Sequence, residues 1–123
     1  MGEPMRSILL AEDDDSMRRF LEKALERAGY RVSAYANGAE AYEGLKEQPY
    51  TLLLTDIVMP EMDGIELAKK AAAIHPEMKI MFITGFAAVA LQPDEQAPRE
   101  SRVLSKPIHL KDLVREVDRM LAA

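Results

Sequence analysis

The segment LLLTDIVMPEMDG, residues 52–64, decides the fold and raises the main question about function. Apolar and small residues lead without a break into the carboxylate of Asp56, and Pro60 and Gly64 then interrupt the chain. Such a run is typical of a strand that is covered on both faces of a sheet. A carboxylate at its end costs free energy unless a bound group stabilises the charge. The position of Asp56 therefore predicts a binding site.

The composition is that of one globular domain. The chain has 123 residues, of which 48% are hydrophobic and 30% charged, so it can bury one core but has no room for a second domain. A net charge of -5 gives no overall basic field for nucleic acid or an anionic membrane. The absence of cysteine excludes disulfides, thiolate metal sites and cysteine nucleophiles. No signal peptide or membrane-spanning run is evident, so we expect a cytoplasmic protein.

Short apolar runs alternate with helical periodicity along the chain. The runs predict buried strands, and apolar residues at helical spacing between them predict helices. The predicted strands cover residues 8–11, 31–35, 50–55, 78–83 and 103–104. Helices are predicted over residues 17–28, around 41–45, over 65–74 and over 110–121, with at most a short further helix within 86–91.

This alternation predicts an α/β fold with a parallel sheet between two helix layers, because right-handed crossovers place the helices on both faces. In such sheets, ligands bind beyond the carboxyl ends of the strands. Polar residues follow four of the predicted strands, namely Glu12 and Asp13, Asp56, Thr84, and Lys106 within SKP. We expect all of them to converge on one edge of the sheet.

The chemistry of this set favours a hard divalent cation. Three carboxylates at one edge repel one another unless a cation neutralises them. Mg²⁺ prefers oxygen ligands and takes one or two protein carboxylates together with water and phosphate oxygens. Zinc is not expected, because the chain has no cysteine and His75 and His109 are far apart in sequence. With the ammonium of Lys106 and the hydroxyl of Thr84, the set suits phosphoryl transfer onto a carboxylate.

Taken singly, each residue also has an ordinary structural explanation. Acids after a strand often cap the next helix, as Asp14 or Asp15 would, and for Asp13 alone capping is as good an explanation as binding. Asp63-Gly64 alone is a turn, and Lys106 alone is a solvated lysine. The coincidence of such residues at four strand ends is what favours a site.

Glu12-Asp13, the segment TDIVMPEMDG, the FITG that contains Thr84 and the SKP that contains Lys106 resemble, in this order, the receiver domain of two-component response regulators. The resemblance spans residues 6–121 and leaves 1–5 as an N-terminal extension and 122–123 as a tail. It implies a flavodoxin-like (βα)5 fold, a three-layer sandwich with the parallel sheet order 2-1-3-4-5. It also implies phosphorelay signal transduction with Mg²⁺ as the cofactor.

By that resemblance, Asp56 accepts a phosphoryl group from a histidine kinase or a histidine phosphotransferase. Mg²⁺ would be held by Asp13, Asp56 and the backbone carbonyl of Val58, with Glu12 nearby or acting through water. The protein would not be an enzyme beyond Mg²⁺-dependent self-phosphorylation from a phosphodonor and slow autodephosphorylation.

The resemblance also assigns the anion contacts and the switch. Lys106 would pair with the acceptor or its phosphate, and Thr84 would bind a phosphate oxygen. Many receivers carry an aromatic residue three positions before this lysine, where this chain has Val103, so the usual aromatic switch is not expected. The surface that reports phosphorylation is then expected around Val103, Phe86, Val89 and Ile108.

The stretches ILLAEDD, LLLTDIVMPEMDGIELA and KIMFITGFAAVAL resemble single-domain response regulators of alphaproteobacterial cell-cycle control. That resemblance implies a contact with the ClpX unfoldase of the ClpXP protease, in which the unphosphorylated form promotes degradation and phosphorylation stops it. The ending MLAA is similar to the tail by which ClpX recognises tagged proteins, so it is a candidate recognition tail. We expect ClpX, its substrates and a histidine phosphotransferase or kinase as partners of a monomer or weak dimer, with no nucleic acid, no membrane insertion, and the cell pole as one location.

Other functions are weighed against this one. A phosphorelay shuttle or phosphate sink without its own output uses the same site. An aspartate-nucleophile phosphatase of the haloacid dehalogenase class is disfavoured, because the second acid expected two residues after the nucleophile is Val58. A DNA-binding regulator is not expected, because nothing after the last helix could serve as an output domain. Arg18 and Arg19, expected on the outward side of the first helix, either meet an acidic phosphotransfer partner or are solvated.

Overall fold

The computed structural model describes residues 6–84, 102–105 and 109–122. Five strands form one parallel sheet in the order β2-β1-β3-β4-β5, which confirms the predicted α/β fold. The strands are β1 (Ser7–Ala11), β2 (Arg31–Tyr35), β3 (Leu52–Asp56), β4 (Lys79–Thr84) and β5 (Arg102–Ser105). The helices are α1 (Asp15–Arg27), α2 (Gly38–Glu47), α3 (Gly64–Ile74) and α5 (Leu110–Ala122). The short helix predicted within residues 86–91 lies outside the described residues.

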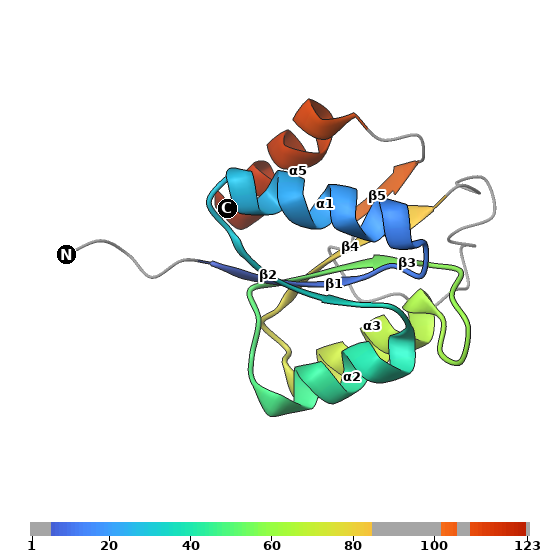
Figure 1. The fold of residues 1–123 in the computed structure, drawn as a ribbon. Helices are drawn as coiled ribbons and strands as arrows, with labels where there is room; N and C mark the ends of the chain where they lie inside the picture. The colour runs from blue at the N-terminus through green and yellow to red at the C-terminus, as the bar shows by residue number, and fades with distance from the viewer. Residues whose placement is uncertain (1–5, 85–101, 106–108, 123) are drawn as a thin grey trace.

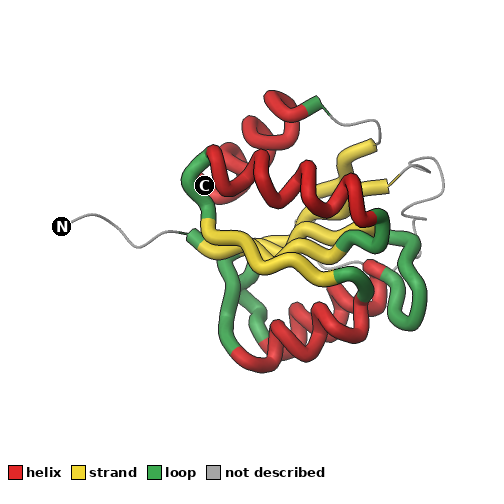
Figure 2. Tube along the Cα trace, in the orientation of Figure 1, coloured by secondary structure: helices red, strands yellow, loops and turns green. Residues whose placement is uncertain are grey.

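The sheet lies between two helix layers. Figure 1 shows α1 and α5 on one face and α2 and α3 on the other, and Figure 2 shows the strands as the middle layer. Successive residues of a strand point to opposite faces, so Ile8 and Leu52 pack in the core beside α1 and α5, whereas Leu9 and Leu53 pack in the core beside α2 and α3. Among the described residues, no helix is both long and apolar enough to cross a bilayer.

Four predicted strands differ from the observed ones at one or both ends. β1 begins at Ser7 rather than at residue 8, and β5 covers Arg102–Ser105 rather than residues 103–104. β3 begins at Leu52 rather than at residue 50, and β4 begins at Lys79 rather than at residue 78; both end one residue later than predicted. Tyr50 and Met78 are buried in the core beside α2 and α3, although they precede the strands. An apolar pattern identifies buried residues and cannot by itself say where backbone pairing begins.

Side-chain caps determine where three helices begin. Asp14, Asn37 and Asp63 each accept a hydrogen bond of 2.8 Å from the backbone amide three residues later. Such a cap contributes about 1 kcal/mol to helix stability. Asp14 therefore caps α1 while Asp15 is its first residue. Asp63, expected in a turn with Gly64, instead caps α3, and Gly64 is the first residue of that helix.

Gly64 holds the loop after β3 against the end of that strand. Its amide donates a 2.8 Å hydrogen bond to the carbonyl of Ile57. A Cβ atom at Gly64 would lie 2.0 Å from the backbone oxygen of Asp56 and 2.9 Å from Cα of Ile57. The start of α3 and the end of β3 thus approach each other so closely that no side chain fits between them.

The last helix is tied to the amino-terminal side of the sheet. The guanidinium of Arg6 donates to the carbonyl of Leu121, and the hydroxyl of Tyr30 donates to the carboxylate of Asp118. Leu121 is only 5% exposed and belongs to the core beside α1 and α5. The leucine of the expected recognition tail is therefore a core residue of the folded domain.

Replacing Gly64 by alanine should lower the free energy of unfolding by about 3 kcal/mol, because the added methyl group meets backbone atoms that cannot rotate away. The matched control is Gly44→Ala in α2, where the nearest atom is the hydroxyl of Tyr35, at the movable end of a side chain. Urea unfolding of both variants measures the difference. A loss for Gly44→Ala as large as that for Gly64→Ala would contradict the close approach of α3 to β3.

Stability at high pH should depend on Tyr30. Burial and the hydrogen bond to Asp118 raise the pKa of Tyr30 from 10.0 to about 12. Because the phenol ionises more easily in the unfolded chain, its stabilising effect is complete below pH 10 and is lost as the pH rises through the folded-state pKa of about 12. Urea unfolding across this range should show stability falling more steeply in the wild type than in Tyr30→Phe. Equal slopes would rule out this role for Tyr30.

Candidate metal centre

The register of the sheet brings two acidic segments together. β1 and β3 are parallel neighbours in which Ala11 pairs with Thr55, so the next residues, Glu12 and Asp56, come side by side at the carboxyl edge. One carboxylate oxygen from each of Glu12, Asp13 and Asp56 lies within 4.8 Å of the others. The predicted convergence of these three side chains is observed.

Two of these three carboxylates are buried. Glu12 is 1% exposed and Asp56 is 6% exposed, whereas Asp13 faces solvent. Buried carboxylates are costly unless hydrogen bonds or a cation compensate them. All three residues offer the hard oxygen ligands that divalent cations such as Mg²⁺ and Ca²⁺ prefer. The acidic cluster, open to solvent on the side of Asp13, could therefore hold a metal ion.

Three hydrogen bonds hold Glu12, two through its backbone and one through its carboxylate. Its amide donates to the carbonyl of Tyr35 over 3.1 Å, and its own carbonyl accepts a 3.0 Å hydrogen bond from the guanidinium of Arg18. Its Oε2 atom accepts a 3.1 Å hydrogen bond from the amide of Asp14. These bonds orient the buried carboxylate beside Asp56.

Arg18 has a structural role that the sequence did not indicate. Its guanidinium pairs with Asp15 at 2.7 Å while it binds the carbonyl of Glu12, and its side chain is only 21% exposed. The prediction that Arg18 faces outward, as a partner contact or a solvated side chain, is wrong, because the carbonyl of Glu12 in the loop after β1 and the carboxylate of Asp15 in α1 both lie within its reach. Arg19 is exposed, as predicted.

The chain around Asp56 is also well supported. The buried hydroxyl of Thr55 donates to the carbonyl of Asp56 over 2.9 Å, and the amide of Ile57 donates to the carbonyl of Ile83 in β4 over 3.1 Å. Val58 follows with a side chain that is 60% exposed. Its backbone carbonyl, expected as a metal ligand, belongs to the loop that Gly64 holds against β3.

The remaining expected site residues lie partly beyond the described chain. Thr84 ends β4 and pairs with Ser105 of β5, so both strands end at the same edge as β3. Val103 in β5 is partly buried and packs against the core beside α2 and α3. Lys106, Phe86, Val89 and Ile108 lie outside the described residues, and their expected roles stay predictions.

Sequence reasoning missed three residues that support the cluster: Arg18, Thr55 and Gly64. The only signal for Arg18 was its helical spacing from Asp15, which is common on exposed helices. The sequence pattern assigned Thr55 to a strand and Gly64 to a turn. Their roles depend on contacts between segments that no local pattern reveals.

Comparisons with known proteins identify the family of this domain. Residues 8–118 match the family model of the response regulator receiver domain. The response regulator receiver protein CpdR of Brucella abortus (strain 2308) is 69% identical over 119 residues, covering 97% of this chain and 99% of that protein. The sensor kinase CckA of the same strain is 37% identical over 117 residues, covering 94% of this chain but only 12% of the kinase.

Among solved structures, the response regulator protein TrrA from Thermotoga maritima, in complex with Mg²⁺-BeF, superposes with a TM-score of 0.84. It is 25% identical, and the match covers 94% of this chain and 99% of that one. Receiver domains take phosphate from histidine kinases, so the acidic cluster lies in a domain of known signalling chemistry. On the family match over residues 8–118, this chain belongs to the response regulator receiver domain family.

Proposed function

We propose that the protein is a stand-alone response regulator that accepts a phosphoryl group on Asp56 from a histidine kinase or a histidine phosphotransferase. The observation that carries the proposal is the gathering of Glu12, Asp13 and Asp56 at the carboxyl edge of the sheet, with oxygens within 4.8 Å. The match to CpdR over 99% of that protein's length supports a regulator made of one receiver domain.

Asp56 is the best placed of the three acids to act as the nucleophile. It ends the central strand β3, where the hydroxyl of Thr55 donates to its carbonyl. The next residue, Ile57, is hydrogen-bonded to Ile83 of β4 and to Gly64 of α3. Glu12 already accepts a hydrogen bond from the amide of Asp14, and Asp13 lies exposed on a loop. In the transfer, a carboxylate oxygen of Asp56 forms a bond to phosphorus, the bond from phosphorus to the donor imidazole breaks, and the imidazole nitrogen keeps the electron pair.

Mg²⁺ fits the donor set better than a softer metal would. Asp13, Asp56 and the backbone carbonyl of Val58 would hold it, and Glu12 would act nearby or through water. When bound, the ion offsets the charge of the carboxylates and of the incoming phosphoryl group. The TrrA structure in complex with Mg²⁺-BeF supports this choice, since its fold superposes on this one.

The anion contacts and the switch complete the proposal. Lys106 would pair with the phosphate and Thr84 would bind one of its oxygens. β5 carries Val103 where many receivers have an aromatic residue, so the surface around Val103, Phe86, Val89 and Ile108 would respond without an aromatic side chain turning inward.

We propose further that the output is a protein contact that phosphorylation breaks. The unphosphorylated form would bind the ClpX unfoldase and promote ClpXP-dependent degradation of substrates in cell-cycle control, in the cytoplasm. The supporting observations are the resemblance to single-domain cell-cycle regulators and the similarity to CpdR and to the kinase CckA. Since Leu121 is buried and its carbonyl binds Arg6, recognition of the C-terminal tail by ClpX would require the last turn of α5 to open.

Acetyl phosphate and Mg²⁺ should raise the intact mass by one phosphoryl group in the wild type but not in Asp56→Asn. Asp13→Asn should raise the Mg²⁺ concentration needed for half-maximal phosphorylation at least about tenfold, since removal of a charged ligand weakens metal binding. The matched control is Glu26→Gln, an exposed acid on α1 that is not in the cluster. An unchanged mass in the wild type, or equal labelling of Asp56→Asn, would overturn Asp56 as the acceptor.

Pull-down of the ClpX N-terminal domain tests the output. Wild type and Asp56→Ala should both bind it without a phosphodonor. After incubation with acetyl phosphate and Mg²⁺, the wild type should lose at least about tenfold in affinity while Asp56→Ala does not change. If binding by the wild type is indifferent to the phosphodonor, the protein is better described as a phosphorelay shuttle or phosphate sink.

A further inference from the structure

The acceptor loop, which we define as residues 57–63 between β3 and α3, is closed at its ends and anchored in the core. The amide of Gly64 donates to the carbonyl of Ile57 over 2.8 Å, which joins the two ends of the loop. Ile57 and Met59 are 9% and 8% exposed and belong to the core beside α2 and α3, whereas Val58 between them is 60% exposed. The backbone of Val58, a proposed ligand of Mg²⁺, therefore lies between two residues that are fixed in the core.

The middle of the acceptor loop has a strained backbone. Glu61 has a φ of 69°, in the left-handed region that residues other than glycine rarely adopt. The amide of Met62 donates to the carbonyl of Pro60 over 2.8 Å, so the chain turns within three residues. A backbone in such a conformation persists only where surrounding contacts hold it. The acceptor loop therefore needs support from a neighbouring element.

α2 gives this support at its first residue. A Cβ atom at Gly38 would lie 2.1 Å from the backbone oxygen of Met62 and 2.9 Å from its carbonyl carbon and its Cβ. Gly38 is buried, and Met62 is partly buried against the core that also contains Ala41 of α2. The backbone of the acceptor loop thus packs directly against the backbone of α2, with no room for a side chain at position 38.

The start of α2 is itself fixed. The side chain of Asn37 accepts a 2.8 Å hydrogen bond from the amide of Glu40, and its carbonyl accepts one of 3.1 Å from the amide of Ala41. Farther along, the ammonium groups of Lys46 in α2 and Lys70 in α3 both lie over the ring of Tyr42, at 4.9 and 5.3 Å from its centre. Figure 1 shows the two helices side by side under the sheet. Gly38 therefore belongs to a well-supported layer.

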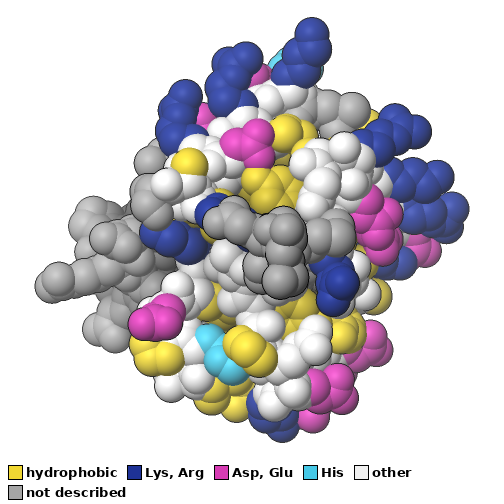
Figure 3. All heavy atoms as spheres, turned by 90° about the vertical axis from the view of Figure 1, so that its left-hand side faces the viewer, with side chains coloured by type: hydrophobic (Ala, Val, Ile, Leu, Met, Phe, Trp, Pro, Cys, Tyr) yellow, Lys and Arg dark blue, Asp and Glu magenta, His cyan; other side chains and the backbone are white. Residues whose placement is uncertain are grey.

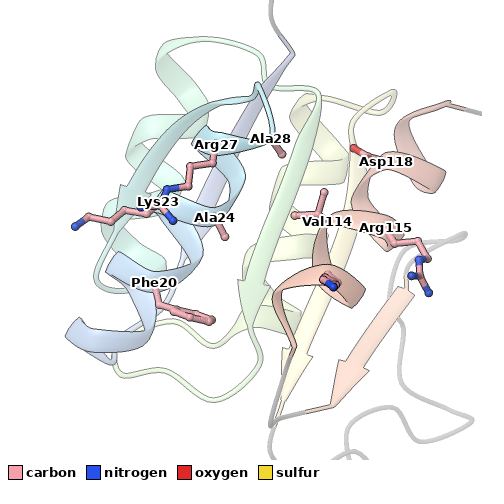
Figure 4. A pocket seen from close by; sticks show the side chains of 9 residues that line it. Phe20, Lys23, Ala24, Arg27, Ala28, Val114, Arg115 and Asp118 are labelled. Carbon is pink, nitrogen blue, oxygen red and sulfur yellow. The ribbon is translucent and has the colours of Figure 1, made fainter.

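The helices on the other face of the sheet leave a wider space between them. A groove of about 710 Å³ separates α1 from α5, with an apolar floor into which Phe20 and Val114 point (Figure 4). Figure 3 shows Lys and Arg side chains along the upper edge of the molecule, the side on which Figure 1 places α1 and α5. No residue that lines this groove belongs to the acceptor loop. Of the glycines that the structure describes, Gly38 is the one that brings a separate helix against the loop.

We propose that Gly38 is a positioning residue for the metal site. By admitting the backbone of Met62, it fixes the acceptor loop and with it the backbone of Val58 beside the acidic cluster. The inference rests on the proposed function, since it assumes that this cluster binds Mg²⁺. A larger residue at position 38 would displace Met62, so the site would lose affinity for the ion although every ligand is still present.

A Mg²⁺ titration of the full chain, followed through the amide chemical shifts of Glu12, Asp13 and Asp56, measures the dissociation constant of the ion directly. Gly38→Ala should raise this constant at least about tenfold, the usual effect of losing a contact that orients a metal ligand. The matched control is Gly44→Ala, which adds the same methyl group to the same helix but meets the movable hydroxyl end of Tyr35. The control should bind Mg²⁺ as the wild type does.

Two further measurements separate positioning from a general loss of stability. With acetyl phosphate as the donor, Gly38→Ala should need more Mg²⁺ for half-maximal phosphorylation and yet approach the wild-type rate at saturating Mg²⁺. Before Mg²⁺ is added, its amide signals from residues 57–63 should differ from those of the wild type, whereas the same signals of Gly44→Ala should not. Signals that change only within α2 would contradict a displacement of the acceptor loop.

Asn37→Ala keeps the proposal testable if Gly38→Ala does not fold. Loss of this cap loosens the first turn of α2 without adding an atom, and it should raise the Mg²⁺ dissociation constant about threefold. A constant that neither Gly38→Ala nor Asn37→Ala changes, or an equal rise in Gly44→Ala, would overturn the role of Gly38 and leave the metal site in place. If the wild type itself does not bind Mg²⁺, the proposed function fails, and this inference fails with it.

Discussion

The parallel pairing of β1 with β3 is the constraint on which the rest of the structure depends. With Ala11 opposite Thr55, the residues that follow, Glu12 and Asp56, must meet at one edge of the sheet. A shift of this register by one residue would exchange the side chains of β3 between the two cores, which are packed for different partners, and would separate the two acids. The cores on both faces of the sheet thus enforce the geometry of the acidic cluster.

Holding acids together requires support from several directions. Arg18 binds the carbonyl of Glu12 and the amide of Asp14 binds its carboxylate, while Thr55 donates to the carbonyl of Asp56. Gly64 lets α3 approach the end of β3 so closely that the loop between them has little freedom. These contacts hold the acids in place before any ion or phosphate binds. Binding then costs less free energy, because the side chains lose less conformational entropy.

The two helix layers have different surroundings. α2 and α3 support the loop after β3, whereas α1 and α5 enclose an apolar groove with a basic rim. α5 also carries the C-terminal end into the core through Leu121 and its bond from Arg6. The acidic cluster at the edge of the sheet and the groove between α1 and α5 have no residue in common.

By itself, the sequence determined the strand and helix types, the parallel sheet and the acids at its carboxyl edge, because burial periodicity and the residues that follow each strand are local features. It also indicated Asp14 as one of two possible caps of α1. Only the tertiary structure decided that Tyr50 precedes β3, that Arg18 turns back onto Glu12, and that Gly64 abuts Asp56. These features depend on distances between segments far apart in the chain, and such distances exist only once the sheet and its helices have packed.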